Sequence, residues 1–229
     1  MPRARRFMTT EWRWLLGVTY AADPARLERL IPPGCEVDTL EGAARVSLVA
    51  FGFHNTRVGR FAIPGHVRFP EINLRFYIRD AGVRGVCFVR ELVPRPAITL
   101  VARGIYNEPY RTTRMAEEVA VGDGITVRHR FGAGQRIEAH AVREGVLPAE
   151  DSAAYWLTHH TLGVGRSHRG ALMRYRVEHE VWPLHDVTDL RLDVDYGAVY
   201  GTEWAHLNTA EPSHLTLAAG SPVRVYFPT

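Results

Sequence analysis

The segment Phe69–Asp80 alternates apolar and polar side chains, and this pattern constrains the fold more than any other part of the sequence. Its apolar members are Ile72, Leu74, Phe76 and Ile78, and its polar members are Glu71, Asn73, Arg75, Tyr77 and Arg79. Because successive side chains of a β-strand point to opposite faces, the alternation predicts a half-buried strand. Its polar face either contacts bulk water or lines a cavity where Glu71, Asn73 and Arg75 meet a small polar ligand. The strand itself does not decide between these two interpretations.

The rest of the sequence predicts a series of short strands. Glycine-containing turns, such as Gly122-Asp123-Gly124, separate segments that are rich in strand-forming residues. Loops are expected at His54–Arg68 and at the glycine-rich segment Gly163–Gly170. The further strands are expected at Trp12–Tyr20, Glu36–Thr39, Ala44–Phe53, Val86–Val93, Ile98–Tyr106, Thr113–Val121, Ile125–Phe131, Arg136–Arg143, Leu172–Val181, Val187–Val194 and Val223–Phe227.

Two short helices are predicted between these strands. Asp23 is a suitable N-cap for a helix over Asp23–Ile31, and Pro24 suits its first turn. The second helix is expected at Pro148–His159. Many strands and two helices predict one β-rich α+β domain over residues 1–229, with a curved or closed sheet. Residues 1–10 are expected to be a flexible or peripheral N-terminus.

The composition excludes one class of chemistry and disfavours several partners. All 28 lysine-plus-arginine positions are arginine, so no lysine amine is present for Schiff-base catalysis. The net charge of +3 is spread over scattered arginines, and we expect no nucleic-acid partner. No apolar stretch is long enough for a signal sequence or a membrane span. Cys35 and Cys87 form no CxxC motif, so we expect buried thiols in a reducing cytoplasm.

Three segments resemble the acetoacetate-decarboxylase-like superfamily, and in particular its YqjF-like branch. They are Val18–Gly34, with its short helix followed by Pro-Pro-Gly, then Phe69–Arg75, and then Val177–Leu184. The resemblance extends over most of the chain. It implies a β-cone or barrel-like sheet around a central cavity for a small molecule, often within a homo-oligomer.

The resemblance also implies where a site would lie and how it would differ. In the decarboxylases a glutamate and a lysine further along the chain face the cavity. Glu71 matches the glutamate in its Phe-Pro-Glu context, whereas Tyr110 stands at the place of the lysine and Arg111 follows it. Neither tyrosine nor arginine forms an imine, so Schiff-base decarboxylation is lost even if the cavity is kept.

These residues suggest roles, each with a structural alternative. Glu71 is the candidate general acid or base and Tyr110 a hydrogen-bond donor to a ligand carbonyl, although Tyr110 is equally suited to a core position. Asn73, Arg75 and Arg111 are candidate ligand-binding residues, because guanidinium groups bind carboxylates and phosphates, but arginines on solvated strand faces are common. His179 and Trp182 belong to the third matching segment and are expected to contact the ligand or to pack. No HExxH motif or tight cluster of metal ligands is present, so we expect no metal and no cofactor.

Three functional hypotheses follow. The first is an enzyme that performs acid–base chemistry on a small carboxylate or keto compound. The second is a protein that binds a small organic molecule, with an anion as one candidate, without transforming it. In the third the fold is chiefly a building block of a homo-oligomer. A fold by itself does not choose among them.

Overall fold

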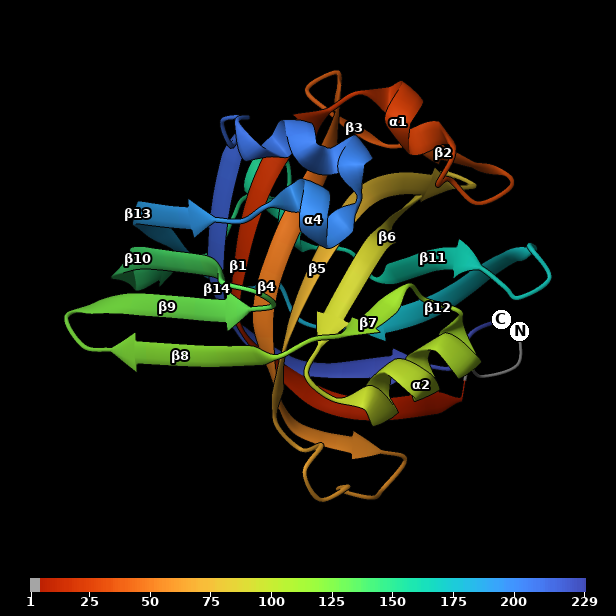
Figure 1. Ribbon diagram of the computed structural model, residues 1–229, viewed down its shortest axis with the longest axis horizontal. Coiled ribbons are helices and arrows are strands. Elements are labelled where there is room, and N and C mark those ends of the chain that lie inside the picture. The colour runs from red at the N-terminus through yellow and green to blue at the C-terminus, as the bar shows by residue number, and fades with distance from the viewer. Residues whose placement is uncertain (1–4) are drawn as a thin grey trace.

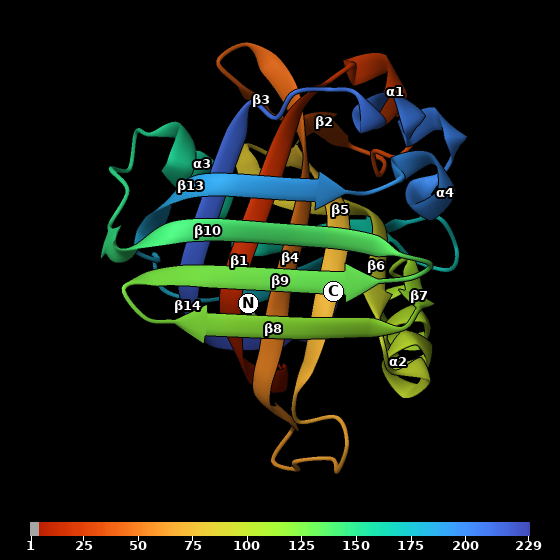
Figure 2. The same cartoon turned by 60° about the vertical axis from the view of Figure 1, so that its left-hand side comes forward.

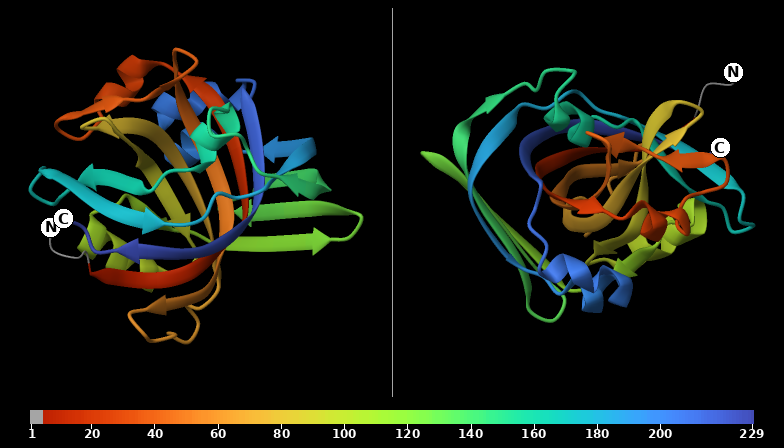
Figure 3. Two further views of the ribbon diagram at one scale, coloured as in Figure 1. Left: turned by 180° about the vertical axis from the view of Figure 1, so that it is seen from behind. Right: turned by 90° about the horizontal axis from the view of Figure 1, so that it is seen from above.

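Seven strands form a closed ring in the structure, a computed structural model that describes residues 5–229. Each strand pairs with the next, and the last pairs with the first, as the view from above in Figure 3 shows. The ring is not a regular barrel, because its fourth and fifth strands run parallel and pair at Val86 and Gly163. In order, the strands are β1 (Arg6–Ala22), β4 (Ala43–Val58), β5 (Phe69–Asp80), β6 (Val83–Val93), β11 (Leu162–Arg166), β12 (Leu172–Glu178) and β14 (His214–Tyr226). The predicted β-rich α+β class with a cone- or barrel-like sheet is therefore confirmed.

A second antiparallel layer covers the outer face of this ring. It consists of β13 (Leu184–Asp193), β10 (Gln135–Val146), β9 (Gly124–Phe131) and β8 (Met115–Val121), and it branches from the ring where β13 pairs with β14. Figure 2 shows these strands crossing in front of β1, β4 and β5, and in Figure 1 they extend to the left of the ring. The main hydrophobic core fills the space between the layers, so that Leu74 and Phe76 of β5 belong to one cluster with Val127 and Ala139.

Strand β5 divides its side chains between this core and the inside of the ring. Ile72, Leu74, Phe76 and Ile78 are fully buried in the core between the layers. The opposite face of the strand carries Glu71, Asn73, Arg75 and Tyr77. The apolar face of β5 is thus taken up by the second layer, and its polar face looks into the ring.

Helices and short strands fill the connections. The helices are α1 (Pro24–Glu28), α2 (Pro96–Tyr106), α3 (Ala153–Thr158), α4 (Tyr196–Tyr200) and the 3-10 helix η1 (Thr202–Asn208), and the short strands are β2 (Cys35–Val37), β3 (Thr39–Leu40) and β7 (Tyr110–Thr112). Helix α1 begins as predicted, since the Asp23 side chain accepts a hydrogen bond from the Ala25 amide at 3.0 Å. None of the helices within residues 5–229 is long and apolar enough to cross a membrane.

The prediction of a strand at Ile98–Tyr106 is wrong, because this segment belongs to helix α2. Its β-branched and apolar residues favour a strand by propensity, but they lie on no sheet face, and Leu100 is 75% exposed. Pro96 stands at the first helical positions, and Asn107 ends the helix in the left-handed conformation, with φ 47°. With α4 and η1, this helix raises the number of helices above the two that were predicted.

Other segments differ from the predictions in extent. β4 continues to Val58, so the expected loop His54–Arg68 begins later, and α3 starts at Ser152 as its N-cap rather than at Pro148. The first half of the expected loop Gly163–Gly170 forms β11. An N-terminus that is flexible or peripheral was expected over residues 1–10. Residues 6–10 instead begin β1, where Phe7 and Thr10 are buried. Residues 1–4 lie outside the described residues.

Candidate functional site

A cavity of about 240 Å³ lies inside the ring of strands. Helix α2 closes one side of it through Ala97, Ile98, Val101 and Ala102, which share one face of the helix. Ile63, in the connection between β4 and β5, and Val101 also line the cavity, and each is 44% exposed. The cavity therefore reaches solvent between α2 and this connection.

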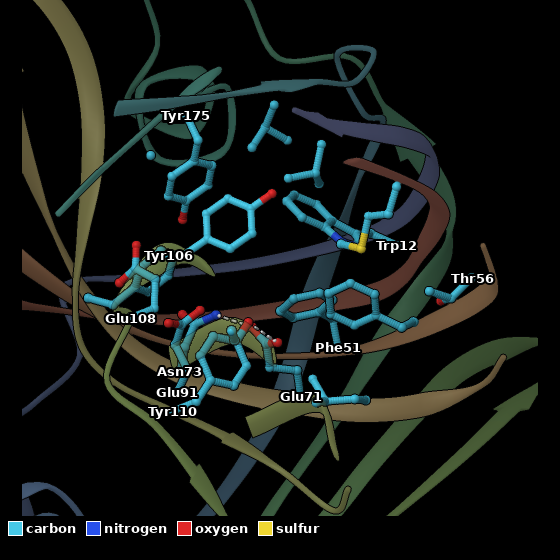
Figure 4. Close-up of a pocket in the computed structure, with 18 of the residues that line it drawn as sticks. Trp12, Phe51, Thr56, Glu71, Asn73, Glu91, Tyr106, Glu108, Tyr110 and Tyr175 are labelled. Atoms are coloured by element: carbon cyan, nitrogen blue, oxygen red, sulfur yellow. Dashed lines mark hydrogen bonds between the residues drawn. The ribbon is translucent and has the colours of Figure 1, made fainter. Parts of the chain in front are cut away.

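The walls of the cavity differ from one side to the other (Figure 4). One side is apolar, and its residues come mainly from β1, β4 and the segment before β13. They include Met8, Trp12, Leu15, Phe51, Phe53, Phe69 and Trp182. The other side is polar and carries Glu71, Asn73, Glu91, Tyr106, Glu108, Tyr110 and Tyr175. An occupant would therefore meet polar groups on one side and aromatic and aliphatic surface on the other.

Glu71 is the centre of a buried hydrogen-bond network on the polar side. Its side chain comes from the inward face of β5 and is only 3% exposed. The Tyr110 hydroxyl donates to Glu71 Oε2 at 2.9 Å, and Asn73 Nδ2 donates to Glu71 Oε1 at 3.1 Å. Both oxygens of the carboxyl group are thus held, which fixes its orientation in the cavity wall.

Two further buried carboxyl groups line the same side. Glu91 on β6 is opposite Asn73 in the antiparallel register, and on its other edge it pairs with Tyr110 of β7. Glu108 lies in the connection between α2 and β7. Glu91 is 3% exposed and Glu108 is 5% exposed. One oxygen of each, Glu91 Oε2 and Glu108 Oε1, is buried without a hydrogen-bond partner in the described chain.

Burial makes these carboxyl groups hard to ionise. It raises the pKa of Glu71 to about 7, although the hydrogen bonds from Asn73 and Tyr110 and the charge of Arg75 act in the opposite direction. Burial and the nearby Glu71 charge raise the pKa of Glu108 to about 8. Burial and the charges of Glu108 and Glu71 raise the pKa of Glu91 well above its usual range. Glu71 is thus close to half-ionised at neutral pH, which suits a group that both accepts and returns a proton.

The raised pKa of Glu71 predicts a specific dependence of stability on pH. A carboxyl group whose pKa is higher in the folded protein stabilises the fold while protonated, and that stability is lost as the pH rises from the unfolded pKa through the folded one. Relative to the Glu71→Gln variant, the wild type should therefore lose about 3 kcal/mol of unfolding free energy between about pH 4 and about pH 8. Urea unfolding of both proteins over this range measures the difference. A constant difference would show that Glu71 has an ordinary pKa.

Tyr106 and Tyr175 complete the polar side of the cavity. The Tyr106 hydroxyl donates to the Tyr226 carbonyl at 3.0 Å, and its ring meets that of Tyr175 edge to face at 5.0 Å. Tyr175 lies directly against Gly163 of β11, where a Cβ atom would be 2.1 Å from Tyr175 Cζ. The glycine at position 163 therefore leaves the space that the Tyr175 ring occupies.

The two arginines singled out in the sequence lie in different places. Arg75 lines the cavity, where its Nη2 donates to the Leu157 carbonyl at 3.2 Å and its guanidinium lies 5.8 Å from the Tyr77 ring centroid. Arg111 is exposed on β7 and lines a separate surface groove with Arg90 and Arg103. Tyr110 points into the cavity, and Arg111, the next residue of β7, points to the opposite face of the strand. The structure therefore does not bring Arg111 together with Glu71.

His179 and Trp182 lie on the cavity wall and stack on each other, with ring centroids 4.1 Å apart. The Trp182 indole donates to Ser221 Oγ at 2.8 Å. His179 Nδ1 lies 2.7 Å from the Glu180 carbonyl oxygen, and Nε2 lies 3.1 Å from that of His160. Burial lowers the pKa of His179. These contacts anchor both rings in the wall. Within residues 5–229, no three His, Cys, Asp or Glu side chains are grouped as metal ligands.

Sequence reasoning missed Glu91, Glu108, Tyr106 and Tyr175. A weak signal existed for Glu91, a carboxylate within the apolar run of a predicted strand. Its inward direction follows only from the register that sets it opposite Asn73. Glu108 follows a segment predicted as a strand, and Tyr175 depends on the pairing of β11 with β12, so neither had a local signal.

Comparison with known proteins identifies the family of this chain. The DUF2071 family, described as an uncharacterized conserved protein, matches residues 9–222. The chain belongs to this family. It is 28% identical over 184 residues to the uncharacterized protein YqjF of Bacillus subtilis (strain 168), a match that covers 78% of this chain and 75% of YqjF. The resemblance to the YqjF-like branch is therefore confirmed.

Solved structures of acetoacetate-decarboxylase-like proteins share the fold of this DUF2071 member. An acetoacetate decarboxylase-like enzyme from Sphingomonas wittichii RW1 matches with a TM-score of 0.65 and 15% identity, covering 97% of this chain and 92% of that one. Acetoacetate decarboxylase from Legionella pneumophila matches with a TM-score of 0.64 and 13% identity, covering 100% and 91%. The enduracididine biosynthesis enzyme MppR, in complex with pyruvate, matches with a TM-score of 0.63 and 15% identity, covering 99% and 90%. At these identities the similarity establishes the fold alone.

Proposed function

We propose that this protein is an enzyme in which Glu71 transfers a proton to and from a carbon atom of a small carbonyl compound bound in the cavity. The observation that carries the proposal is the Glu71 carboxyl group, buried in the wall of a solvent-connected cavity and held by Tyr110 at 2.9 Å, with its pKa raised to about 7 by burial. A base with a pKa near the working pH is well matched to abstract and return a proton. The binding of pyruvate by MppR, which has the same fold, supports a carbonyl ligand.

The proposed reaction uses the network around Glu71. The ionised carboxylate takes a proton from the carbon next to the ligand carbonyl, and the electron pair moves onto the carbonyl oxygen. Once Glu71 is protonated it is a weaker acceptor, and the Tyr110 hydroxyl then donates to the developing enolate oxygen. Asn73 keeps the carboxyl group in place through its bond to Oε1. Imine formation with a lysine is excluded, since the sequence has no lysine.

Incorporation of deuterium tests this proposal without knowledge of the natural substrate. Small ketones, keto acids and amino ketones are incubated with the protein in deuterium oxide, and loss of the α-proton signal is followed by NMR. The rate of exchange is expected to rise with pH through an inflection near 7, as Glu71 ionises. Compounds that bind without exchanging at any pH would contradict the enzymatic proposal.

Tyr110→Phe should move this inflection. The Tyr110 hydrogen bond stabilises the carboxylate and lowers the pKa of Glu71, so its removal raises that pKa further. The inflection of the exchange rate is therefore expected at higher pH in the variant, with a lower rate at pH 7. A purely structural role for Tyr110 would lower the amount of active protein but leave the inflection where it is.

A second candidate function is the binding of a small molecule without turnover. It is favoured by the large share of aromatic and aliphatic residues in the cavity wall. In that case the Glu71→Gln variant would bind the ligand as tightly as the wild type, and neither protein would transform it. The deuterium experiment separates the two functions, because only the enzyme exchanges the α-proton.

A further inference from the structure

We propose that the compound bound in this cavity carries a primary ammonium group attached to a small apolar body, and that Glu91 and Glu108 hold the ammonium group. The inference deepens the proposed function and depends on the same cavity. It concerns the ligand class, which neither the position of Glu71 nor the fold defines.

Unsatisfied acceptors on the polar side are the first observation. Glu91 Oε2, Glu108 Oε1 and Asn73 Oδ1 are buried and accept no hydrogen bond within the described chain. Asn73 lines the cavity and is 2% exposed. Its amide nitrogen donates to Glu71, which leaves its carbonyl oxygen as a further acceptor that is not part of an acidic group. A primary ammonium has three N–H donors and no acceptor. An ammonium group would bring donors to this side of the cavity, where these acceptors have no partner once the acids are ionised.

The balance of charge is the second observation. Three carboxyl groups line the cavity, and Arg75 is the one arginine among its described lining residues. Arg75 donates to the Leu157 carbonyl and lies over the Tyr77 ring. Among residues 5–229, none of the three carboxyl groups forms an ion pair within 4.0 Å, whereas buried Asp38 is paired with Arg79 at 2.7 Å and with Arg84 at 3.3 Å. These buried carboxyl groups lack a counter-ion, which favours their neutral form. A cationic ligand would supply the missing counter-ion and allow an acid to ionise, whereas an anionic ligand would oppose that ionisation.

Aromatic rings supply the third observation. Tyr110 and Tyr175 lie beside the carboxyl groups, and Figure 4 shows both rings on the same side of the cavity as Glu91 and Glu108. The face of a phenol ring attracts a cation. On the opposite side, Trp12 packs edge to face on Phe51 and Phe53, with ring centroids at 5.3 Å and 6.1 Å. The cavity is therefore divided between a cation-binding side and an apolar side, and its volume of about 240 Å³ suits a small ligand.

Binding of an ammonium group should release a proton. The pKa of Glu108, raised to about 8, means that this acid is largely protonated at neutral pH in the empty protein. Burial also raises the pKa of Glu91. A cation stabilises the ionised form, so its binding displaces about one proton. The affinity is therefore expected to rise with pH, by up to about tenfold per pH unit between about pH 6 and pH 8.

Calorimetry with three matched probes tests the inference. The probes are 2-phenylethylamine, 2-phenylethanol and phenylacetate, which differ chiefly in the charge of one end. Titrations at about pH 7.5, in two buffers of different ionisation enthalpy, measure both affinity and proton release. We expect 2-phenylethylamine to bind at least about tenfold more tightly than the alcohol, with the release of about one proton, and phenylacetate to bind most weakly.

Two variants and a control complete the experiment. Glu91→Gln and Glu108→Gln should each weaken 2-phenylethylamine binding by about tenfold or more and reduce the proton release, while 2-phenylethanol binding shows that the cavity is intact. Glu36→Gln, at an exposed position on β2, should change neither. Equal or tighter binding of the alcohol or of phenylacetate, ammonium binding without proton release, or no ammonium binding would overturn the inference.

The two proposals fail separately. If phenylacetate binds best but α-protons of keto compounds still exchange, the ligand class is wrong and the role of Glu71 stands. If 2-phenylethylamine binds as expected but no compound exchanges its α-proton, the enzymatic proposal is wrong and the ligand class stands.

Discussion

Glu71→Gln is expected to slow α-proton exchange by about 10²- to 10⁴-fold, the range over which a positioned acid–base group accelerates a reaction. Glutamine has nearly the same shape as glutamate and still accepts a hydrogen bond from Tyr110, but it neither takes up nor releases a proton. The rate of deuterium incorporation at about pH 8 measures the loss, because there the wild-type carboxyl group is mostly ionised.

Two controls separate chemistry from folding in this experiment. Glu36→Gln, the exposed control used above, should exchange at the wild-type rate. Glu71→Gln should also be at least as stable as the wild type at about pH 8, because the neutral amide avoids the cost of a buried charge. A variant that loses stability at this pH and retains exchange would make Glu71 a structural residue and refute the proposed mechanism.

Gly220→Ala is expected to destabilise the protein by more than about 4 kcal/mol, or to prevent folding. Gly220 lies in β14, opposite Arg13 of β1, with φ +85°, a conformation that favours glycine. A Cβ atom there would be 1.8 Å from the backbone oxygen of Trp12, and neither strand can yield without breaking the β1–β14 pairing that closes the ring. Chemical denaturation followed by circular dichroism measures the effect.

A matched glycine gives the control for this substitution. Gly104, on helix α2, has no heavy atom within 4 Å of its Cβ position and no positive φ. Gly104→Ala should therefore be neutral or stabilise the helix slightly, by up to about 1 kcal/mol. Equal stability of the two variants would show that the close approach of β1 and β14 does not constrain position 220.

The sequence was most informative where a pattern is local. The alternation over Phe69–Asp80 and the cap at Asp23 each predicted an element that the structure contains, because side-chain direction in a strand and capping of a helix depend on neighbouring residues. The same local preference failed at Ile98–Tyr106. There the strand-forming residues meet no sheet, and the proline at position 96 and Asn107 define a helix instead.

The sequence alone determined that one face of β5 is polar, that Glu71 lies on that face, and that no lysine exists for an imine. Only the tertiary structure decided that this face looks into the ring, because alternation is the same for a strand with its polar side in water. It also decided which groups converge there. Glu91 reaches the cavity through the register of β5 and β6, Glu108 through the turn after α2, and Tyr175 through the space left by Gly163. Closing a sheet brings together residues from distant parts of the chain, and the raised pKa values of the carboxyl groups follow from that burial.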